Sequence, residues 1–216
     1  METLNLQKVA SWPRVKSRNS ALRMSDGALP SPRRLLHFVE LTIFVLLAFS
    51  FSQGQQSRPT ESQVKAAYLF NFGKFVRWPG VLSTSDESLQ ICVVGKNPFG
   101  SVLEATVKGE VIDGRKVTAR TLSTIQEAAG CRILFVSASE EGRLAGIFSA
   151  AQRLGVLTVS DIPNFVARGG MIGFVNQNER IRFEVNAAPL ADAGLTVSSE
   201  LLKVAIRVIP KGGGEN

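Results

Sequence analysis

The chain has 216 residues, 44% of them hydrophobic, which indicates one domain with additional segments. Its net charge of +7 is unevenly spread: residues 1–52 carry seven Lys or Arg and three Asp or Glu, and the rest carry eighteen and fifteen. The basic residues after position 52 are scattered singly or in pairs, whereas nucleic-acid-binding proteins gather them in a patch. The charge pattern therefore argues against nucleic-acid binding.

The N-terminal extension, residues 1–54, has the order of a secretory signal peptide. Arg33-Arg34 precedes a mostly apolar run, residues 35–51, which small residues follow. The unbroken apolar core is shorter than the roughly 20 residues of a transmembrane helix. We expect export to the periplasm of a Gram-negative bacterium, with cleavage near residues 52–54. A retained membrane anchor is the alternative.

The sequence leaves open which methionine starts the chain. The first 23 residues make the basic region of the signal peptide unusually long. Met24 is therefore an alternative start to Met1. In either case the mature domain is expected at residues 59–210.

Residues 60–78 have the pattern of an aromatic-rich helix. Thr60 and Gln63 form a capping box at its start, and apolar side chains recur at helical spacing. Pro79 ends the helix, because a residue before proline avoids the α region. The main interpretation is a helix that packs on a core. In the alternative, some of its rings form a partner or ligand surface, and the candidates are Tyr68, Phe72 and Trp78.

Strands and helices then alternate along the chain. The predicted strands are residues 89–94, 116–120, 132–137 and 156–160, and the helices between them are near 98–108, 123–127 and 140–153. This alternation predicts an α/β fold: a mainly parallel sheet with helices on both faces.

The C-terminal part has a different pattern. Residues 171–175 and 180–185 flank a turn and predict an antiparallel hairpin near the C-terminus. Phe174 on this hairpin is a further candidate for a partner or ligand surface. Helices are expected near 187–193 and 200–209, and residues 211–216 are expected to form a disordered tail.

Cys92 and Cys131 are the two cysteines of the chain. In an oxidising compartment an even number suggests one disulfide, and two buried free thiols are the alternative. In a sheet of 2-1-3-4 order the first and third strands are neighbours. Both cysteines would then lie at the N-terminal edge of adjacent strands, within the range that a disulfide needs.

Residues for catalysis are scarce. The single histidine, His37, lies in the N-terminal extension, which excludes a histidine-based triad and most zinc or copper sites in the mature domain. The Gly95–Gly100 spacing is similar to that of a P-loop, but Ser101 stands where the loop lysine should be. We expect an ordinary strand-to-helix turn there, and we predict neither an enzyme nor a bound cofactor or metal.

Asp161 follows the fourth predicted strand. The carboxyl ends of parallel strands are where α/β proteins usually bind ligands, so Asp161 could line a cleft. The alternative is that it caps the turn through Pro163.

Seven stretches carry a family resemblance over about residues 60–209. They are VKAAYLFNFGKFVRWP (64–79), ICVVGKNPFG (91–100), CRILFVS (131–137), LTVSD (157–161), GGMIGF (169–174), RIRFEVN (180–186) and GLTVSS (194–199). In this order they resemble the YfiR-like family of periplasmic proteins.

The resemblance implies a periplasmic repressor without enzymatic activity. It would bind the periplasmic region of a membrane-bound sensor, a diguanylate cyclase, and so keep cyclic-di-GMP and biofilm formation low. It also implies a homodimer, and it makes Cys92–Cys131 the counterpart of one family disulfide. The chain has no cysteines for the second family disulfide.

Two functions from different classes therefore remain. The first is a regulator that works by protein contact, through the aromatic first helix or the hairpin. The second is a periplasmic small-ligand-binding or sensor accessory protein with a cleft beside Asp161. An exposed apolar patch would favour the first, and a deep pocket beside Asp161 the second.

Overall fold

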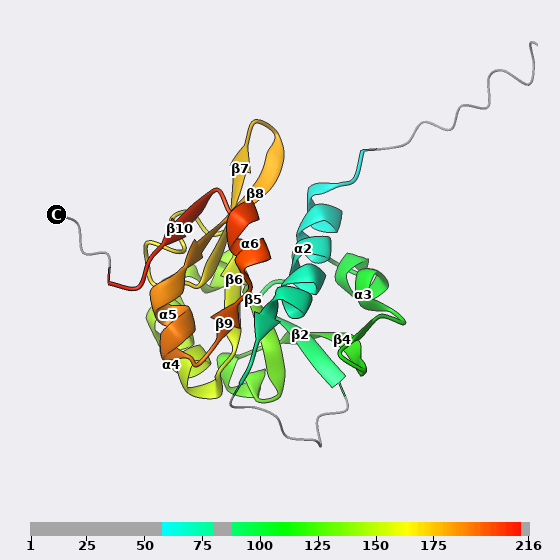
Figure 1. Cartoon of the computed structure of the whole chain (residues 1–216). Coiled ribbons are helices and arrows are strands. Elements are labelled where there is room, and N and C mark those ends of the chain that lie inside the picture. Colours follow the sequence, from blue (N-terminus) through cyan, green and yellow to red (C-terminus); the bar gives the residue numbers. More distant parts are fainter. Residues whose placement is uncertain (1–57, 80–87, 213–216) are drawn as a thin grey trace, which may run out of the picture. The chain divides into compact units, whose positions relative to one another are not determined.

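The computed structural model describes residues 58–79 and 88–212, which form an α/β domain (Figure 1). The predicted signal peptide and residues 213–216 of the predicted tail lie outside the described residues. Within the described part, no helix combines the length and the apolar character needed to cross a bilayer.

The centre of the domain is an eight-stranded sheet of order β10-β8-β7-β6-β5-β2-β4-β3. Its four central strands run parallel, and their order is the predicted 2-1-3-4: β2 (Ser88–Val94), β4 (Arg115–Leu122), β5 (Cys131–Val136) and β6 (Leu157–Ser160). The remaining strands of the sheet are β3 (Val111–Ile112), β7 (Ile172–Gln177), β8 (Arg180–Asn186) and β10 (Arg207–Ile209). The hairpin β7–β8 is antiparallel, as predicted.

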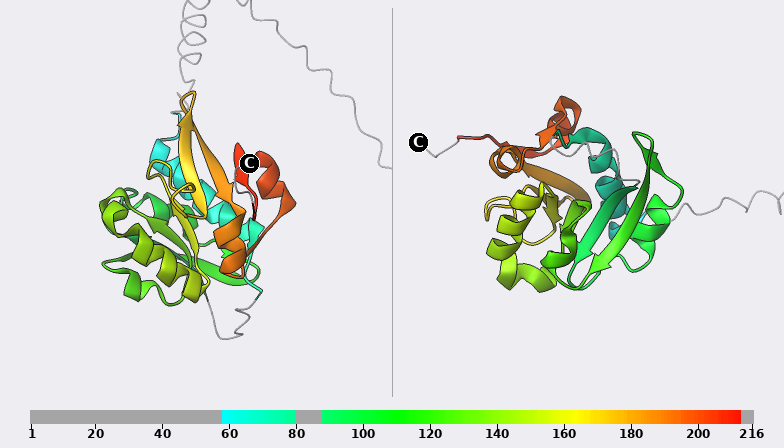
Figure 2. Two further views of the ribbon diagram at one scale, coloured as in Figure 1. Left: turned by 90° about the vertical axis from the view of Figure 1, so that its left-hand side faces the viewer. Right: turned by 90° about the horizontal axis from the view of Figure 1, so that it is seen from below.

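Alternate side chains of the central strands enter two separate cores, one on each face of the sheet. Ile91 and Val93 of β2 belong to the core under the first helix, and Val94 belongs to the core on the other face. Helices cover both faces (Figure 2), which confirms the predicted fold class. They are α2 (Glu61–Phe75), α3 (Val102–Val107), η1 (Ile125–Ala128), η2 (Ala138–Arg143), α4 (Leu144–Leu154), α5 (Ala187–Asp192) and α6 (Ser199–Val204).

The first helix is shorter than predicted. Thr60 and Gln63 form the expected capping box, but α2 ends at Phe75 rather than at Trp78. Val76 and Arg77 instead form β1, which pairs with β9 (Thr196–Val197). A helical turn just before Pro79 would lack backbone hydrogen bonds. Pairing of β1 with β9 supplies hydrogen bonds to this segment instead.

Other boundaries also shift. The helix predicted from residue 98 begins only at Val102, and the helix predicted from residue 140 is a 3-10 segment followed by α4. The predicted helix 200–209 ends at Val204, because Arg207–Ile209 pairs with β8 as β10. Branched residues in this last segment favour an extended chain.

A two-residue turn closes the β7–β8 hairpin. Asn178 and Glu179 have φ angles of 51° and 60°, as in a type I′ turn, and Gln177 pairs with Arg180 beside them. Left-handed backbone is uncommon for glutamate. The hairpin tip extends beyond the sheet beside the first turns of α2 (Figure 1).

Candidate functional site

A groove separates the first turns of α2 from the β7–β8 hairpin. We call it the helix–hairpin groove, and it has a volume of about 700 Å³. Its walls are formed by Glu61, Val64 and Tyr68 of α2 and by Asn176, Glu179, Arg180, Ile181 and Arg182 of the hairpin. A smaller hollow continues from it to Asp161, so the groove lies at the carboxyl ends of the parallel strands.

Aromatic contacts set the distance between the two walls of this groove. Tyr68 packs on Phe174 and Phe183 of the hairpin, with ring centroids 5.8 and 5.4 Å away. Its hydroxyl donates to the Ile181 carbonyl oxygen at 3.4 Å. Such ring pairs add stability beyond the apolar area they bury. Tyr68 therefore fastens α2 to the hairpin while part of its side chain lines the groove.

A buried ion pair forms the floor beside the groove. The Lys65 ammonium group lies 2.5 Å from the Asp161 carboxylate and 2.5 Å from the Glu61 carboxylate. Burial lowers the pKa of Lys65, but hydrogen bonds to both carboxylates, and their charges, outweigh this and raise it above the ordinary value of 10.5. Asp161 thus balances the charge of a lysine on the inner side of α2. The Asp161 carboxylate is therefore already paired within the protein.

Charged residues line the rim of the groove. Arg58 and Glu61 lie on the helix side, and Glu179, Arg180 and Arg182 lie on the hairpin side. Neither hairpin arginine has an ion-pair partner among the residues that the structure describes. The hairpin side of the groove thus carries two positive charges that no acidic side chain of the described residues balances directly.

Hydrogen bonds of the protein itself cross the crevice between β2 and β5, where doubly wound sheets usually bind ligands. Ser137 donates to the Lys96 carbonyl oxygen at 2.7 Å, and the Lys96 N–H donates to Ser139 at 2.9 Å. In the same turn the Phe99 N–H is bound by the Asn97 side chain. These donors of the Gly95–Gly100 turn are occupied by the protein itself, in agreement with an ordinary strand-to-helix turn.

An exposed apolar edge lies at the end of the domain. Val204, Ile206 and Val208 are 58%, 42% and 39% exposed, and they are three of the five large hydrophobic residues exposed in the described part of the chain. They end α6 and lead into β10, whose outer side is an edge of the sheet. We call this surface the α6–β10 edge. The sequence prediction missed it, because these residues were expected to form a helix near 200–209.

The five candidate surface residues fall into three places. Tyr68 and Asp161 lie at the helix–hairpin groove and its adjoining hollow. Phe72 and Phe174 are buried, with 0% and 4% of their surfaces exposed. Phe72 supports the groove from the core, and Phe174 lines the hollow beside Asp161. Trp78 lies apart from them, in a pocket with the first residues of β2 and β4.

Lys65 is a site residue that the sequence prediction missed. Its signal was present: it stands between Val64 and Leu69 on the apolar side of a predicted helix, four residues after Glu61. Hydrophobic periodicity cannot identify the ion-pair partner of Lys65, because Asp161 is distant in the sequence.

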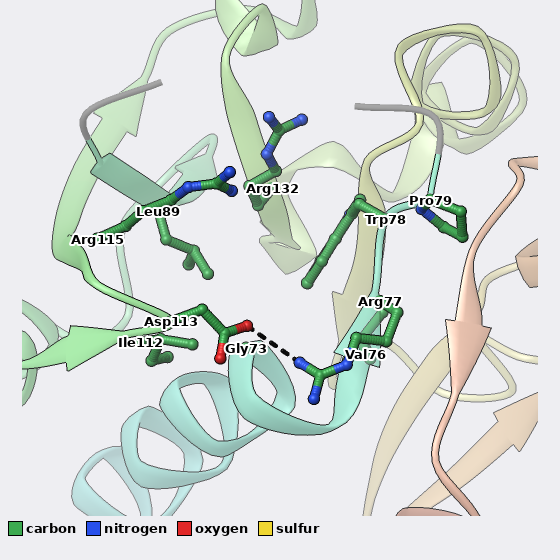
Figure 3. Close-up of a pocket in the computed structure, with 10 residues that line it drawn as sticks. All are labelled: Gly73, Val76, Arg77, Trp78, Pro79, Leu89, Ile112, Asp113, Arg115 and Arg132. Carbon is green, nitrogen blue, oxygen red and sulfur yellow. Dashed lines mark hydrogen bonds and ion pairs between the residues drawn. The ribbon is translucent and has the colours of Figure 1, made fainter. Parts of the chain in front are cut away.

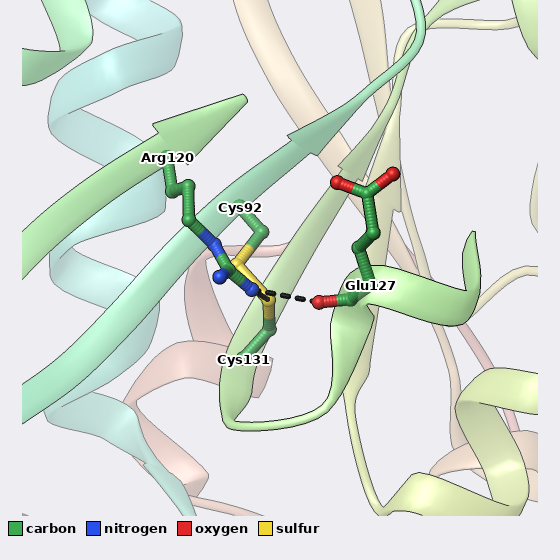
Figure 4. Close-up of a disulfide and its surroundings, with 4 residues drawn as sticks. All are labelled: Cys92, Arg120, Glu127 and Cys131. Atoms are coloured by element: carbon green, nitrogen blue, oxygen red, sulfur yellow. Dashed lines mark hydrogen bonds between the residues drawn. A yellow bond between two sulfur atoms is a disulfide. The ribbon is translucent and has the colours of Figure 1, made fainter. Parts of the chain in front are cut away.

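The cysteines form a disulfide between neighbouring strands, Cys92–Cys131, with Cα atoms 6.0 Å apart (Figure 4). Cys92 lies within β2 rather than at its edge, opposite Leu134, and Cys131 lies opposite Gln90. The register shifts at Arg132, and this irregularity turns Cys131 to the face of Cys92. The prediction of a disulfide is confirmed.

Arg120 covers the bridge from β4. Its guanidinium donates to the Glu127 carbonyl oxygen at 2.7 Å and lies 3.9 Å from the Cys131 sulfur (Figure 4). Both cysteines are buried. The described residues contain no cluster of three or more His, Cys, Asp or Glu side chains arranged to hold a metal ion.

A family model described as YfiR/HmsC-like matches residues 62–206, which include the hairpin wall of the groove, the disulfide and the α6–β10 segment up to Ile206. Among solved structures, a conserved domain protein from Vibrio cholerae is 13% identical, with a TM-score of 0.49 over 70% of this chain and 61% of the other. The ABC domain in complex with L-Trp from Streptococcus pneumonia is 11% identical, with a TM-score of 0.46 over 68% and 60%. The chain spans about three-fifths of each structure, and at these values neither similarity bears on function.

Proposed function

The chain belongs to the YfiR/HmsC-like family, and from this membership we propose that it binds and restrains a membrane-bound signalling protein. Proteins of this family are periplasmic and regulatory rather than catalytic. The proposed partner is the periplasmic region of a membrane-bound sensor, a diguanylate cyclase. Restraint of that cyclase would lower cyclic-di-GMP and biofilm formation. No chemical step is required of this chain.

We place the partner's contact at the helix–hairpin groove. The observation that carries this assignment is that two hairpin arginines without an ion-pair partner, Arg180 and Arg182, lie beside the apolar wall around Tyr68. Arginine and tyrosine are enriched among residues that dominate binding energy at protein interfaces.

The groove supports protein contact better than it supports small-ligand binding at Asp161. The hollow beside Asp161 has a volume of about 160 Å³, whereas small-molecule sites usually measure about 300–1,000 Å³. The Asp161 carboxylate is also engaged by Lys65. A ligand there would have to compete with an ion pair already formed.

A homodimer is the second association that we propose, through the α6–β10 edge. An open edge strand presents unpaired backbone groups that can pair with another chain. Exposed apolar side chains beside that edge mark an interaction surface. A twofold arrangement would bring the same edge of two copies together, which is the usual form of a dimer interface.

Capture from a membrane extract tests the partner assignment. Tagged protein is compared with the double variant Arg180→Glu, Arg182→Glu. The control is Arg153→Glu on α4, which makes the same kind of charge reversal outside the groove. We expect the protein and its control to recover a membrane-bound sensor, and the groove variant to recover at least about tenfold less. Equal recovery by all three proteins would contradict the groove as the contact surface.

A further inference from the structure

A second pocket lies at the opposite end of the sheet, where the parallel strands begin (Figure 3). We call it the amino-end pocket. Its volume of about 320 Å³ falls in the range of small-molecule sites. It is lined from the end of α2 and β1 and from the first residues of β2, β4 and β5. Neither the helix–hairpin groove nor the α6–β10 edge shares a residue with it.

One wall of the amino-end pocket is apolar. Val76, Leu89 and Ile112 are buried core residues whose side chains meet there. The Trp78 ring belongs to the same pocket. A ligand that enters would therefore exchange water for an apolar surface, which favours a ligand with an apolar body.

The other wall is basic. Arg77, Arg115 and Arg132 line the pocket together with one acid, Asp113. Figure 3 shows Arg115 and Arg132 on one side of the pocket and the Arg77–Asp113 ion pair, 3.1 Å long, on the other. The Arg115 side chain has no hydrogen-bond or ion-pair partner among the described residues. A guanidinium group in this setting matches the two oxygens of a carboxylate.

The Trp78 side chain also borders the pocket. Its Nε1 is buried and has no hydrogen-bond partner, and among the described residues it is the one side-chain nitrogen or oxygen in this state. Because this atom has no accessible surface, a ligand in the pocket would contact the Trp78 ring and not its N–H.

We propose that the amino-end pocket binds a small organic carboxylate with an apolar body. The carboxylate is held by Arg115, and the apolar body lies on Leu89, Ile112 and the Trp78 ring. This site is separate from the proposed partner surface, so either can fail without the other.

Titration of the full chain with benzoate tests the site. Benzamide is the neutral control of the same shape, and inorganic phosphate is the anion without an apolar body. Binding is measured by calorimetry and by the indole N–H signals in nuclear magnetic resonance. The chain has two tryptophans, Trp12 and Trp78, and the signal that disappears in Trp78→Phe belongs to Trp78. We expect benzoate to bind and to shift the Trp78 signal, and benzamide and phosphate to bind at least about tenfold more weakly.

Two variants complete the experiment. Arg115→Gln should weaken benzoate binding by about tenfold or more, because it removes a charged donor, while Arg153→Gln should leave it unchanged. Equal binding of benzoate and benzamide, equal binding of phosphate, or an unaltered affinity in Arg115→Gln would each overturn the proposal.

Discussion

The Lys65 ammonium group lies 2.5 Å from the Asp161 carboxylate and so joins the first helix to the end of β6. The Lys65 side chain is 9% exposed and that of Asp161 is 27% exposed. The charge of a buried lysine is tolerated only where an acid balances it. This pair therefore fixes one wall of the helix–hairpin groove relative to the sheet.

Removal of the acid should destabilise the domain. We expect Asp161→Ala to lower the free energy of unfolding by about 2 kcal/mol, less than for a fully buried pair because Glu61 still contacts Lys65. Urea unfolding measures the change. Asp192→Ala, which breaks an exposed pair with Lys211, is the control and should cost less than about 0.5 kcal/mol. An equal loss in both variants would contradict the role of the buried pair.

The same pair predicts a dependence on alkaline pH. The pKa of Lys65 in the folded protein is raised above its ordinary value of 10.5. The stability that the pair contributes is therefore complete below that value and is lost as the pH rises through the folded pKa. The free energy of unfolding should fall more steeply above about pH 10.5 in the wild type than in Lys65→Met. Parallel curves for the two proteins would count against this account.

The buried disulfide should act as a structural link rather than as an easily reduced group. Its sequence separation of 39 residues corresponds to about 4 kcal/mol in the chain-entropy model, so Cys92→Ala, Cys131→Ala should lower the free energy of unfolding by up to that amount. Reductant should open the bridge slowly in native protein and rapidly in urea, as read by alkylation and mass spectrometry. Rapid opening in native buffer would show an accessible bridge instead.

Two glycines should respond to alanine in opposite ways. Gly95 has a φ of 87°, and a Cβ there would lie 2.4 Å from the Ser139 hydroxyl oxygen, so Gly95→Ala should destabilise the domain by about 2 kcal/mol. Gly146 lies within α4 with no atom near its Cβ position, so Gly146→Ala should stabilise by about 0.5–1 kcal/mol. Thermal unfolding compares the two variants. The same sign for both would refute this reading of the two positions.

The α6–β10 edge gives a prediction about oligomeric state. Ile206→Glu places a charge on the exposed apolar surface, so it should shift the protein from dimer to monomer in sedimentation velocity. Val111→Glu is the matched control, because Val111 is also an exposed apolar residue but lies on β3, at the other edge of the sheet. Dimers that persist in Ile206→Glu would place the interface elsewhere.

The sequence predicted the central architecture because it depends on local patterns. The apolar strands around Cys92 and Cys131 and the turn before Arg180 are readable from hydrophobic periodicity and turn chemistry alone. The 2-1-3-4 order then brought the two cysteines within reach. The irregularity at Arg132, which gives Cys131 its direction, depends on strand pairing and has no local signature.

The candidate site was predicted less completely, for a physical reason. Tyr68 and Asp161 were identified from helix pattern and strand end, but Phe72 and Phe174 belong to the core, and aromatic composition does not distinguish a buried ring from an exposed one. Arg207–Ile209 became a strand because β8 offered it a partner, with Arg207 bound to Glu184. Long-range pairing of this kind overrides local helix propensity.

Cyclic-di-GMP in cells tests the central claim most directly. The gene is deleted and then restored as wild type, as Arg180→Glu, Arg182→Glu, or as Arg153→Glu, at matched protein levels. We expect deletion to raise cyclic-di-GMP, wild type and the Arg153→Glu control to lower it again, and the groove variant to leave it high. Cyclic-di-GMP that stays unchanged on deletion, or that the groove variant lowers as well as wild type does, would contradict a regulator acting through this groove.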